Sequence, residues 1–344
     1  MSALSWAVVA RTDEPARADW VRAAREVRES GESAESGESE SGAGEPRFVA
    51  WSAVLSSEAE FRAGELVFVE RLHPQRAENP VGGHRARYEE LRAALHQLEA
   101  AVTKAGATLA VAVEPMLVLL DRTRLGAFLS LNGFPVLESA ESVADGGGIL
   151  RPRFAGSDEW LIDAGRTDLF LHRTRTGHEV RRGPGLGSPG ARESADITGL
   201  LAADEIHAVA SLLRVYLSEN HYDIRFAVLD GKVTHAAGVI RGEAVAREWY
   251  GGRRRELEAF LERFGDERWQ RLVALAERTA ASFSGIRWLG VDLALDNHES
   301  EFVFDVDPFG AFLPGLVSGL PNTTDDRGSL SVRGAVLRSL SSRS

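Results

Sequence analysis

The dipeptide Asp230-Gly231 is the feature that most constrains how this chain can fold. It separates two runs rich in apolar and β-branched residues, at 224–229 and 233–240. Asp-Gly favours the two central positions of a tight hairpin turn, because both positions take a positive φ. The sequence therefore predicts an antiparallel β-hairpin in the second half of the chain.

A second predicted strand pair, over 289–295 and 301–306, carries three aspartates at or near its ends. Side chains alternate along a strand, so Asp305 and Asp307 face the same side, and hairpin pairing could bring Asp292 there as well. Three carboxylates among apolar residues repel one another unless a cation neutralises them. Their hard oxygen atoms suit Mg²⁺, which shares its ligand shell with waters and phosphates. The alternative is that these aspartates only end their strands at the solvent edge.

The N-terminal third of the chain alternates predicted strands with predicted helices, which is typical of an open α/β sheet. We expect strands over 5–10, 47–51, 65–69 and 108–113, and helices over 15–27 and 85–105. The second helix has apolar residues at helical spacing, which predicts one buried face. These residues are Tyr88, Leu91, Leu95, Leu98 and Val102.

Beyond residue 115 the sequence predicts a mixture of helices, strands and loops. We expect helices over 121–129, 202–215, 253–264 and 268–283, and strands over 149–154 and 160–163. Residues 174–195 are rich in Gly, Pro and Arg, which predicts a loop. Residues 29–45 contain only Glu, Ser, Gly and Ala, which cannot bury enough apolar surface to fold, so we expect a disordered loop there.

Composition narrows the classes of function. The chain has no cysteine, which excludes disulfides, thiolate metal sites and a cysteine nucleophile. The net charge of −11 falls to −5 when the six glutamates of 29–45 are left out. There is no basic run interleaved with aromatic residues, so a nucleic-acid partner is not expected. No apolar run approaches the roughly 18 residues of a membrane span and no signal segment is visible, so we expect a cytoplasmic protein without a membrane partner.

Five short motifs occur in a fixed order between residues 118 and 316. They are the Asp-Arg helix with Gly-Phe-Pro-Val (121–136), Ile-Leu-Arg-Pro-Arg (149–153), Asp-Ile-Arg with the Gly-Lys turn (222–233), Gly-Val-Asp (290–292) and Asp-Val-Asp-Pro (305–308). Together they resemble the ATP-grasp superfamily, in particular its glutathione-synthase-like and ribosomal-protein-modification-type carboxylate–amine ligases. The segment 308–315 resembles an uncharacterised bacterial subgroup of that superfamily.

The resemblance implies an α/β (α+β) chain with the ATP-grasp fold. An N-terminal open α/β domain would occupy residues 1–115, with a disordered insertion at 29–46. An ATP-grasp domain would occupy 116–344. It would consist of a small central lobe at about 140–218 and a C-terminal ATP-grasp core at about 219–325.

The resemblance also implies which residues act on Mg-ATP. Asp292, Asp305 and Asp307 would bind Mg²⁺, while Arg225 and Arg241 would be catalytic and hold phosphate or a developing acyl phosphate. The residues that would contact the nucleotide are Arg122, Arg151, Val215, Tyr216, Leu217 and Glu219. Of these, the two arginines take the places of phosphate-binding lysines, the segment at 214–217 would read adenine, and Glu219 would lie near the ribose. Residues 251–254 would form an acceptor or substrate-phosphate site, or else a solvated helix start.

The chain departs from the family pattern in three respects. Its only lysines are Lys104 and Lys232, neither at a customary position, so 38 of its 40 basic residues are arginines. Asp307 stands where the family usually has Asn, and the phosphate-covering loop at 155–157 is short and poor in glycine. Arginine can neutralise phosphate with two parallel hydrogen bonds, but it lacks the compact geometry of an ammonium group.

The activity implied by the resemblance is ATP-dependent ligation. The γ-phosphoryl group would pass to a carboxylate, and an amine would then attack the acyl phosphate, releasing phosphate beside ADP. The expected partners are small-molecule or peptide carboxylate and amine substrates, and a homodimer is one expected assembly. Two alternatives retain the same aspartates, namely a nucleotide-binding but catalytically silent partner protein and a small-molecule kinase on the same fold.

Overall fold

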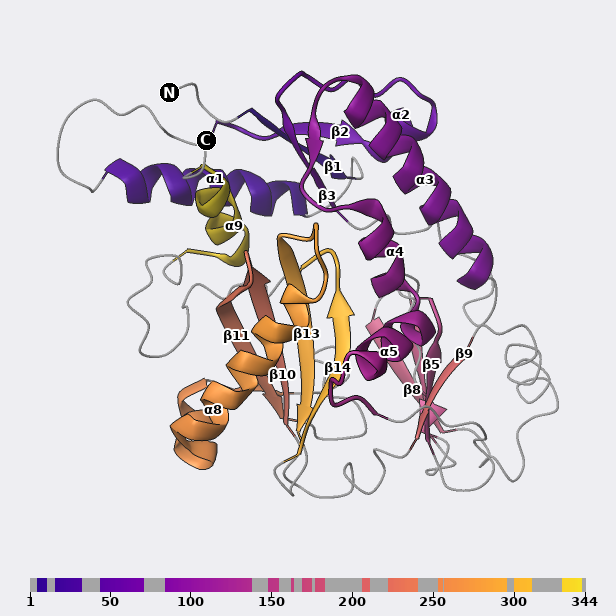
Figure 1. Ribbon diagram of the computed structural model, residues 1–344, viewed down its shortest axis with the longest axis vertical. Helices are drawn as coiled ribbons and strands as arrows, with labels where there is room; N and C mark the ends of the chain where they lie inside the picture. The colour runs from indigo at the N-terminus through magenta and orange to yellow at the C-terminus, as the bar shows by residue number, and fades with distance from the viewer. Residues whose placement is uncertain are drawn as a thin grey trace.

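The computed structural model describes residues 5–10, 16–32, 44–70, 84–137, 148–154, 162–163, 169–174, 177–182, 206–210, 222–240, 253–255, 257–295, 300–310 and 330–341. Within these residues the strands form three sheets, and helices lie over and between them (Figure 1). One sheet is parallel and the other two are antiparallel. The predicted mixture of α and β structure is therefore confirmed.

The first sheet is parallel, with strand order β2-β1-β3-β4. Its strands are β1 (Trp6–Ala10), β2 (Arg47–Ala50), β3 (Leu66–Val69) and β4 (Thr108–Leu109). Every residue of β1 is buried, because this inner strand packs in one core with residues of α1 (Ala16–Glu32) and α3 (His84–Lys104). Such burial on both faces is why the strand is apolar throughout instead of alternating.

The second sheet is antiparallel, with strand order β12-β11-β10-β13-β14. Its strands are β10 (Tyr222–Leu229), β11 (Lys232–Ile240), β12 (Arg253–Arg255), β13 (Trp288–Leu295) and β14 (Glu301–Asp307). Asp230 and Gly231 take φ values of 49° and 75° at the tip of the predicted hairpin. The long helix α8 (Leu257–Ala281) covers one face (Figure 1), where Trp269 packs on Phe226 with ring centroids 5.5 Å apart.

The third sheet is antiparallel, with strand order β8-β7-β6-β5-β9. Its strands are β5 (Gly148–Pro152), β6 (Ile162–Asp163), β7 (Leu169–Thr174), β8 (Gly177–Arg182) and β9 (Ile206–Ala210). Phe154 follows β5 and stacks on Tyr88 of α3, with ring centroids 4.6 Å apart. This contact fixes the base of the third sheet on the helix layer of the first.

Four shorter helices complete the described structure. They are α2 (Trp51–Leu55), α4 (Val113–Leu120), α5 (Arg122–Leu131) and α9 (Val332–Ser341). In Figure 1, α4 and α5 lead from the first sheet toward the third, whereas α9 lies beside α1 above the second sheet. The predicted helix at 121–129 is confirmed, and Gly133 closes it with a φ of 71°.

Three predictions in the second half of the chain are wrong. Residues 206–210, expected within a helix, form β9, and Arg253–Arg255, expected to begin a helix, form the edge strand β12. Gly177–Arg182, expected within a loop, forms β8. In each case a neighbouring strand supplies hydrogen-bonding partners, so tertiary pairing overrides a weak local preference.

The N-terminal predictions need smaller corrections. Helix α1 continues to Glu32, into the segment expected to be disordered, and residues 33–43 of that segment lie outside the described residues. Trp51, expected at the end of a strand, begins α2. The strand expected over 108–113 stops at Leu109, and the unpredicted α4 starts at Val113. Because α4 is apolar on nearly all sides, its sequence carries no amphipathic period that would distinguish it from a buried strand.

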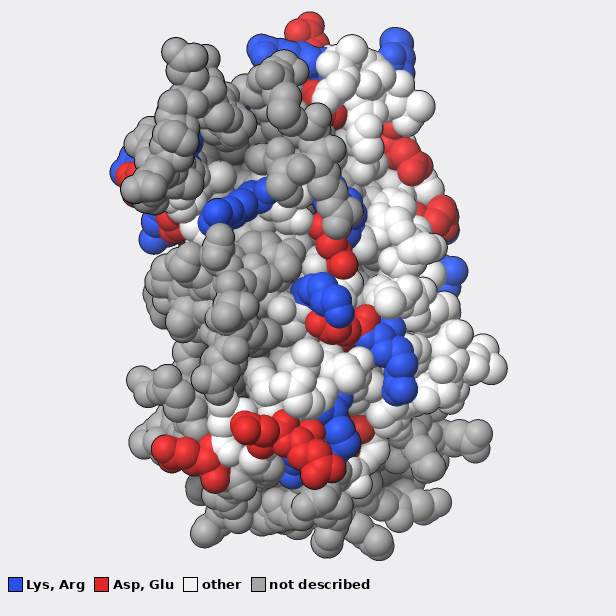
Figure 2. Space-filling view, turned by 60° about the vertical axis from the view of Figure 1, so that its left-hand side comes forward, with Lys and Arg blue, Asp and Glu red and all other residues white. Residues whose placement is uncertain are grey.

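Charged side chains of both signs lie interspersed on the face shown in Figure 2. Among the described residues of that face, the positive charges form no large patch of one sign. None of the described helices is both long and apolar enough to cross a membrane.

Candidate active site

Arg225, Asp292 and Asp305 lie in one row across three neighbouring strands of the second sheet. Asp292 of β13 lies opposite Arg225 of β10 on one side and opposite Asp305 of β14 on the other. Directly opposed residues of an antiparallel pair point to the same face. Ile224 and Phe226, which flank Arg225, belong to the core beneath α8, so the row faces away from α8. The predicted meeting of Asp292 with Asp305 is confirmed.

A β-bulge in β14 sets the direction of its aspartates. The register with β13 shifts by one residue, which leaves Phe304 as the extra residue. Val303 and Val306 are therefore both buried in the core beneath α8, even though simple alternation would turn them to opposite faces. The bulge allows β14 to bury both valines while Asp305 stays on the polar face.

Arg225 binds both carboxylate oxygens of Asp292 through two N–H groups of its guanidinium. Nε donates to Oδ1 at 2.6 Å and Nη2 donates to Oδ2 at 2.5 Å. Burial acts to lower the pKa of Arg225, but the nearby carboxylate of Asp292, with smaller contributions from Asp307 and Asp305, raises that pKa above its usual range. All three predicted aspartates therefore contribute to the electrostatic environment of this one guanidinium.

A second arginine binds Asp305. The side chain of Arg122 is only 2% exposed, and its Nη2 donates to Oδ2 of Asp305 at 3.2 Å. The backbone N–H of Val306 donates to Oδ1 of Asp305 at 3.1 Å, and that of Phe309 donates to Oδ1 of Asp307 at 3.0 Å. The aspartates are thus held in place by backbone donors as well as by arginines.

Helix α5 positions Arg122 through its capping residue, Asp121. The Asp121 carboxylate accepts from the backbone N–H groups of Thr123 and Arg124 at 3.1 and 3.2 Å, as an N-cap residue does. It also accepts from Nε and Nη2 of Arg153, at 2.9 and 2.8 Å, and these hydrogen bonds raise the pKa of Arg153. Asp121 therefore joins the start of α5 to the base of the third sheet, directly beside Arg122.

Sequence reasoning missed this role of Arg153 and the contact between Tyr88 and Phe154. The sequence analysis placed Asp121 within the helix expected over 121–129, whereas the structure makes it the N-cap of that helix. Which of the many arginines would pair with Asp121 could not be predicted, because that choice depends on how β5 packs against α3 and α5.

The three aspartates offer the hard oxygen ligands that Mg²⁺ prefers, but two of them are engaged by arginines. In the part of the chain that the structure describes, no three or more His, Cys, Asp or Glu side chains are grouped so that they could hold a metal ion. The carboxylate oxygens are of the type that magnesium prefers, but in this structure Asp292 and Asp305 are placed to pair with guanidinium groups. The metal role of these residues stays a prediction.

The other predicted site residues are not placed by the described structure. Arg241, Val215, Tyr216, Leu217 and Glu219 lie outside the described residues, as do Gly251 and Gly252. Arg151 lies in β5 with its backbone opposite that of His207, and its role stays a prediction. Lys232, on the hairpin tip, pairs with Glu277 of α8 at 2.9 Å.

No protein-family model and no curated protein matches the chain. Its structure does match solved ATP-grasp ligases. The ATP-grasp ligase PsnB complexed with its minimal precursor matches with a TM-score of 0.54 and 14% identity, over 100% of both chains. The D-cycloserine synthetase DcsG matches with a TM-score of 0.51 and 16% identity, over 98% of this chain and 99% of that one.

A third match widens the range of relatives. D-alanine–D-alanine ligase from Bacillus anthracis matches with a TM-score of 0.51 and 10% identity, over 99% of this chain and 98% of that one. The structural matches establish the fold, whereas identities this low leave the activity of this chain open. The sheets, their order along the chain and these matches agree with the resemblance seen in the sequence, and the chain has the fold of the ATP-grasp ligases.

Proposed function

We propose that this protein is an ATP-dependent carboxylate–amine ligase that forms an amide through an acyl phosphate. The observation that carries the proposal is the row of Arg225, Asp292 and Asp305 on one face of the second sheet, with Arg122 bound to Asp305. An ATP-grasp fold that presents arginines and carboxylates together on one sheet face has the groups needed to bind a nucleotide triphosphate and a cation. It needs no side-chain nucleophile, in keeping with the absence of cysteine.

Arg225 and Arg122 would exchange carboxylate for phosphate when the nucleotide binds. A guanidinium presents parallel N–H donors that suit a carboxylate and a phosphoryl group equally well. Nucleotide phosphates that reach this face would compete with Asp292 for Arg225 and with Asp305 for Arg122. Arg225 would then hold the transferred phosphoryl group and the charge that develops on it.

Asp292, Asp305 and Asp307 would hold Mg²⁺ once the arginines have turned to phosphate. A bound magnesium ion supplies neutralisation of the phosphate charge during transfer. With Asp in place of Asn at position 307, the cluster carries one more negative charge, which strengthens its attraction for a cation. Asp307 follows Asp305 by two positions in β14, so the two side chains point to the same face of the sheet.

The remaining assignments are proposed on the resemblance alone. Arg151 and Arg241 would contact phosphates, Val215 to Leu217 would contact adenine, and Glu219 would lie near the ribose. The domain divisions at 115, 140–218 and 219–325, a cytoplasmic location and a homodimeric assembly belong to the same proposal.

The structural neighbours support both peptide and small-molecule substrates. PsnB is complexed with a precursor peptide, whereas DcsG is named for the small molecule D-cycloserine. Two of the PsnB complexes contain Mg and ADP, which supports the proposed nucleotide and metal. We propose that the substrates of this chain are a carboxylate and an amine from one of these two classes.

A catalytically silent nucleotide-binding protein is the second candidate. Arginines stand at both customary lysine positions, and Arg122 binds a predicted metal ligand in the described structure. If nucleotide phosphates did not displace these arginines from the aspartates, nucleotide could bind without phosphoryl transfer.

The test is Mg²⁺-dependent ATP turnover by the purified chain, with pooled amino acids and cell extract as substrates. ADP, AMP and phosphate are separated by chromatography, and Asp305→Ala is compared with Glu267→Ala, an exposed α8 variant on the other face of the sheet. Substrate-dependent ADP and phosphate, lost only in Asp305→Ala, support the ligase. Nucleotide binding without turnover supports the silent protein, and phosphorylated product without an added amine indicates a kinase.

A further inference from the structure

Helix α9 contacts two regions that are distant in sequence. On one side, Ala335, Val336 and Leu337 are buried in the core that contains Trp20 of α1. On the other, Val332 packs against Ala227 of β10. The helix therefore touches both the N-terminal α/β layer and the sheet that carries the candidate active site.

A hydrogen bond at the start of α9 strengthens its contact with the second sheet. Nε2 of His235, on β11, donates to the carbonyl oxygen of Leu330 at 2.7 Å, and the His235 side chain is fully buried. Near the other end, the hydroxyl of Ser339 donates to Oδ2 of Asp230 at 2.6 Å. Asp230 is itself held by Arg287, at 2.8 and 3.0 Å. Both ends of the helix are thus tied to the β10–β11 hairpin.

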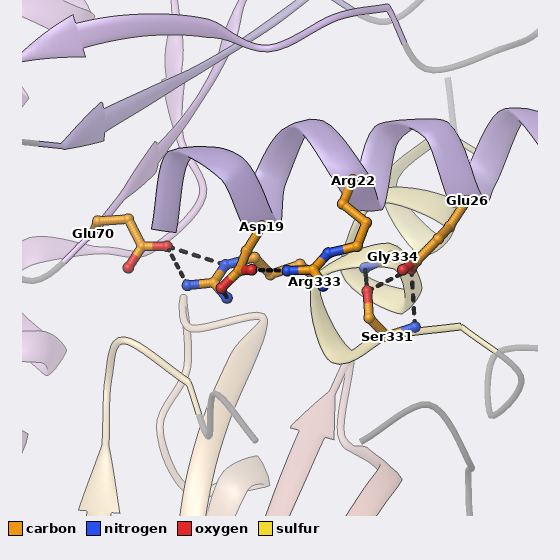
Figure 3. Close-up of polar contacts among 7 residues, drawn as sticks. All are labelled: Asp19, Arg22, Glu26, Glu70, Ser331, Arg333 and Gly334. Atoms are coloured by element: carbon orange, nitrogen blue, oxygen red, sulfur yellow. Dashed lines mark hydrogen bonds and ion pairs between the residues drawn. The ribbon is translucent and has the colours of Figure 1, made fainter. Parts of the chain in front are cut away.

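Arg333 is the main polar anchor between α9 and the N-terminal layer (Figure 3). Its Nη2 and Nε donate to Oε1 of Glu70 at 3.0 and 3.3 Å, and its Nη1 donates to Oδ2 of Asp19 at 3.1 Å. The guanidinium carbon lies 5.5 Å from the ring centroid of Trp20, which donates its own N–H to Glu70 at 2.5 Å. Glu70 follows β3 directly, so one arginine of α9 joins α1 to the end of the parallel sheet.

The first turn of α9 is capped from α1 (Figure 3). Oε2 of Glu26 accepts from the backbone N–H and the hydroxyl of Ser331, at 3.1 and 2.5 Å. A carboxylate at this position is also stabilised by the positive end of the α9 helix dipole. Gly334 permits the close approach, since a Cβ atom there would lie 2.8 Å from Oε2 of Glu26 and 3.1 Å from Cβ of Leu330.

The start of α9 lies beside the candidate active site. Ala227, which Val332 covers, follows Arg225 by two positions on the same strand, so both residues face the same side of the sheet. At about 3.3 Å per strand residue, the two backbone positions are about 7 Å apart. Any movement of α9 away from Ala227 would therefore uncover the face next to Arg225.

We propose that α9 is a clasp that holds the N-terminal α/β layer over the face bearing Arg225, Asp292 and Asp305, and that it opens as a unit without unfolding either sheet. A helix of ten residues is marginal on its own, so α9 depends on its anchors. Its polar anchors toward the N-terminal layer lie on one turn, at Ser331 and Arg333, while Leu330 and Ser339 tie it to the β10–β11 hairpin. A helix that is held by docking contacts with its neighbours can open as a local unit when those contacts are weakened. The proposal does not depend on the ligase activity.

Hydrogen exchange of the full chain, followed by mass spectrometry, tests the clasp. Arg333→Met is compared with Arg22→Met, which removes an arginine that pairs with the same Asp19 but has a side chain 65% exposed. Removing one partner of a buried ion pair leaves the other without its counter-charge, so amides of α9 should exchange on the order of 100-fold faster in Arg333→Met. Amides of β10 and β13 should keep the wild-type rate, and Arg22→Met should leave all three elements unchanged.

Two results would overturn the proposal. One is an exchange rate of α9 in Arg333→Met no higher than in Arg22→Met, which would show that the anchor does not hold the helix. The other is a rise in α9 matched by an equal rise in β10 and β13, which would make the helix part of one cooperative unit. Should Arg333→Met fail to fold, Gly334→Ala decides by the same comparison of α9 with β10 and β13, because it disturbs only the crossing with α1.

Discussion

Two buried or partly buried arginines in this protein lie among carboxylates. One belongs to the candidate active site, and the other joins α9 to the N-terminal layer. Arg225 faces Asp292 on a sheet surface, where the two side chains are 23% and 16% exposed. Arg333 faces Glu70 between helices, where the side chains are 10% and 6% exposed. Trp20 lies against the second pair and also bonds its carboxylate.

The same kind of ion pair is expected to have different roles in these two surroundings. Around Arg225 the opposing charges come from adjacent strands and are partly exposed, so under the proposed function an incoming phosphate or cation would replace either partner. Around Arg333 the partners come from α1, β3 and α9, and exchange would require the helix to move. Disrupting the first pair should therefore change activity more than stability, and disrupting the second should do the reverse.

The largest expected effect is on turnover, in Asp305→Asn. The amide keeps the shape of the side chain but removes the charge that would meet a cation, so the turnover rate should fall on the order of 10³-fold. The free energy of unfolding should fall by about 2 kcal/mol: the buried guanidinium of Arg122 loses its counter-charge, while the amide oxygen can still accept a hydrogen bond from Arg122 or from the Val306 backbone. Urea unfolding beside the turnover assay checks both. Unchanged turnover in an active enzyme would remove Asp305 from the site.

Arg333→Met should have the largest effect on stability. Glu70 would lose its counter-charge in a buried setting, which should lower the free energy of unfolding by about 3 kcal/mol. Affinity for Mg-ADP, measured by calorimetry below the unfolding temperature, should stay within about threefold of the wild-type value. A loss below about 0.5 kcal/mol would mean that the two arginine pairs do not differ as proposed.

Arg225→Lys tests whether the two parallel hydrogen bonds of Arg225 matter beyond its charge. An ammonium group can replace the charge but not the two parallel hydrogen bonds to Asp292, so turnover should fall about 100-fold. Arg268→Lys, on the α8 side of the sheet, is the control and should leave turnover within about twofold. Equal effects of the two substitutions would show that the fork of Arg225 has no special part in the reaction.

Gly334→Ala should be milder than Arg333→Met. The added Cβ would press on Glu26 and Leu330, and the displacement of the helix crossing should cost about 1–2 kcal/mol of unfolding free energy. The control is Ala335→Gly on the same helix, which lowers helix propensity and removes one buried methyl group without adding atoms to the crossing with α1. Thermal unfolding of the three proteins should place Gly334→Ala below the wild type.

The smallest expected effect is a pH dependence at Glu70. Burial raises the pKa of Glu70 above 4.5, against the opposing influence of Arg333 and Trp20, and the Asp19 carboxylate raises it further. The folded protein then binds a proton on Glu70 at a pH where the unfolded chain does not. The contribution of Glu70 to stability therefore increases as the pH falls from neutral toward 4.5. Glu70→Gln has no titrating carboxyl group at this position. The difference in unfolding free energy between the wild type and Glu70→Gln should therefore vary with pH, and a constant difference would contradict this prediction.

Much of the second sheet could be predicted because its signals are local. Asp-Gly selects one turn type, and period-two alternation places Asp305 and Asp307. The strand β9 could not be predicted, since its partner β5 is distant in sequence. The strands β8 and β12 pair with the preceding strands β7 and β11, but their sequences carry no clear strand pattern of their own. The bulge at Phe304 was equally invisible, although it decides which side chains of β14 face the site.

The sequence alone placed Asp305 and Asp307 on one face with Asp292 as a possible neighbour, and the order of its motifs indicated the fold. That β10 lies beside β13, and which arginine meets which carboxylate, depends on the tertiary structure. Arg122 reaches Asp305, Arg153 reaches Asp121 and Arg333 reaches Glu70. Local sequence sets backbone geometry through steric and hydrogen-bonding rules that act over a few residues. Charge pairing in a chain with 38 arginines depends on long-range packing, which only the folded arrangement of α1, α5, α9 and the three sheets provides.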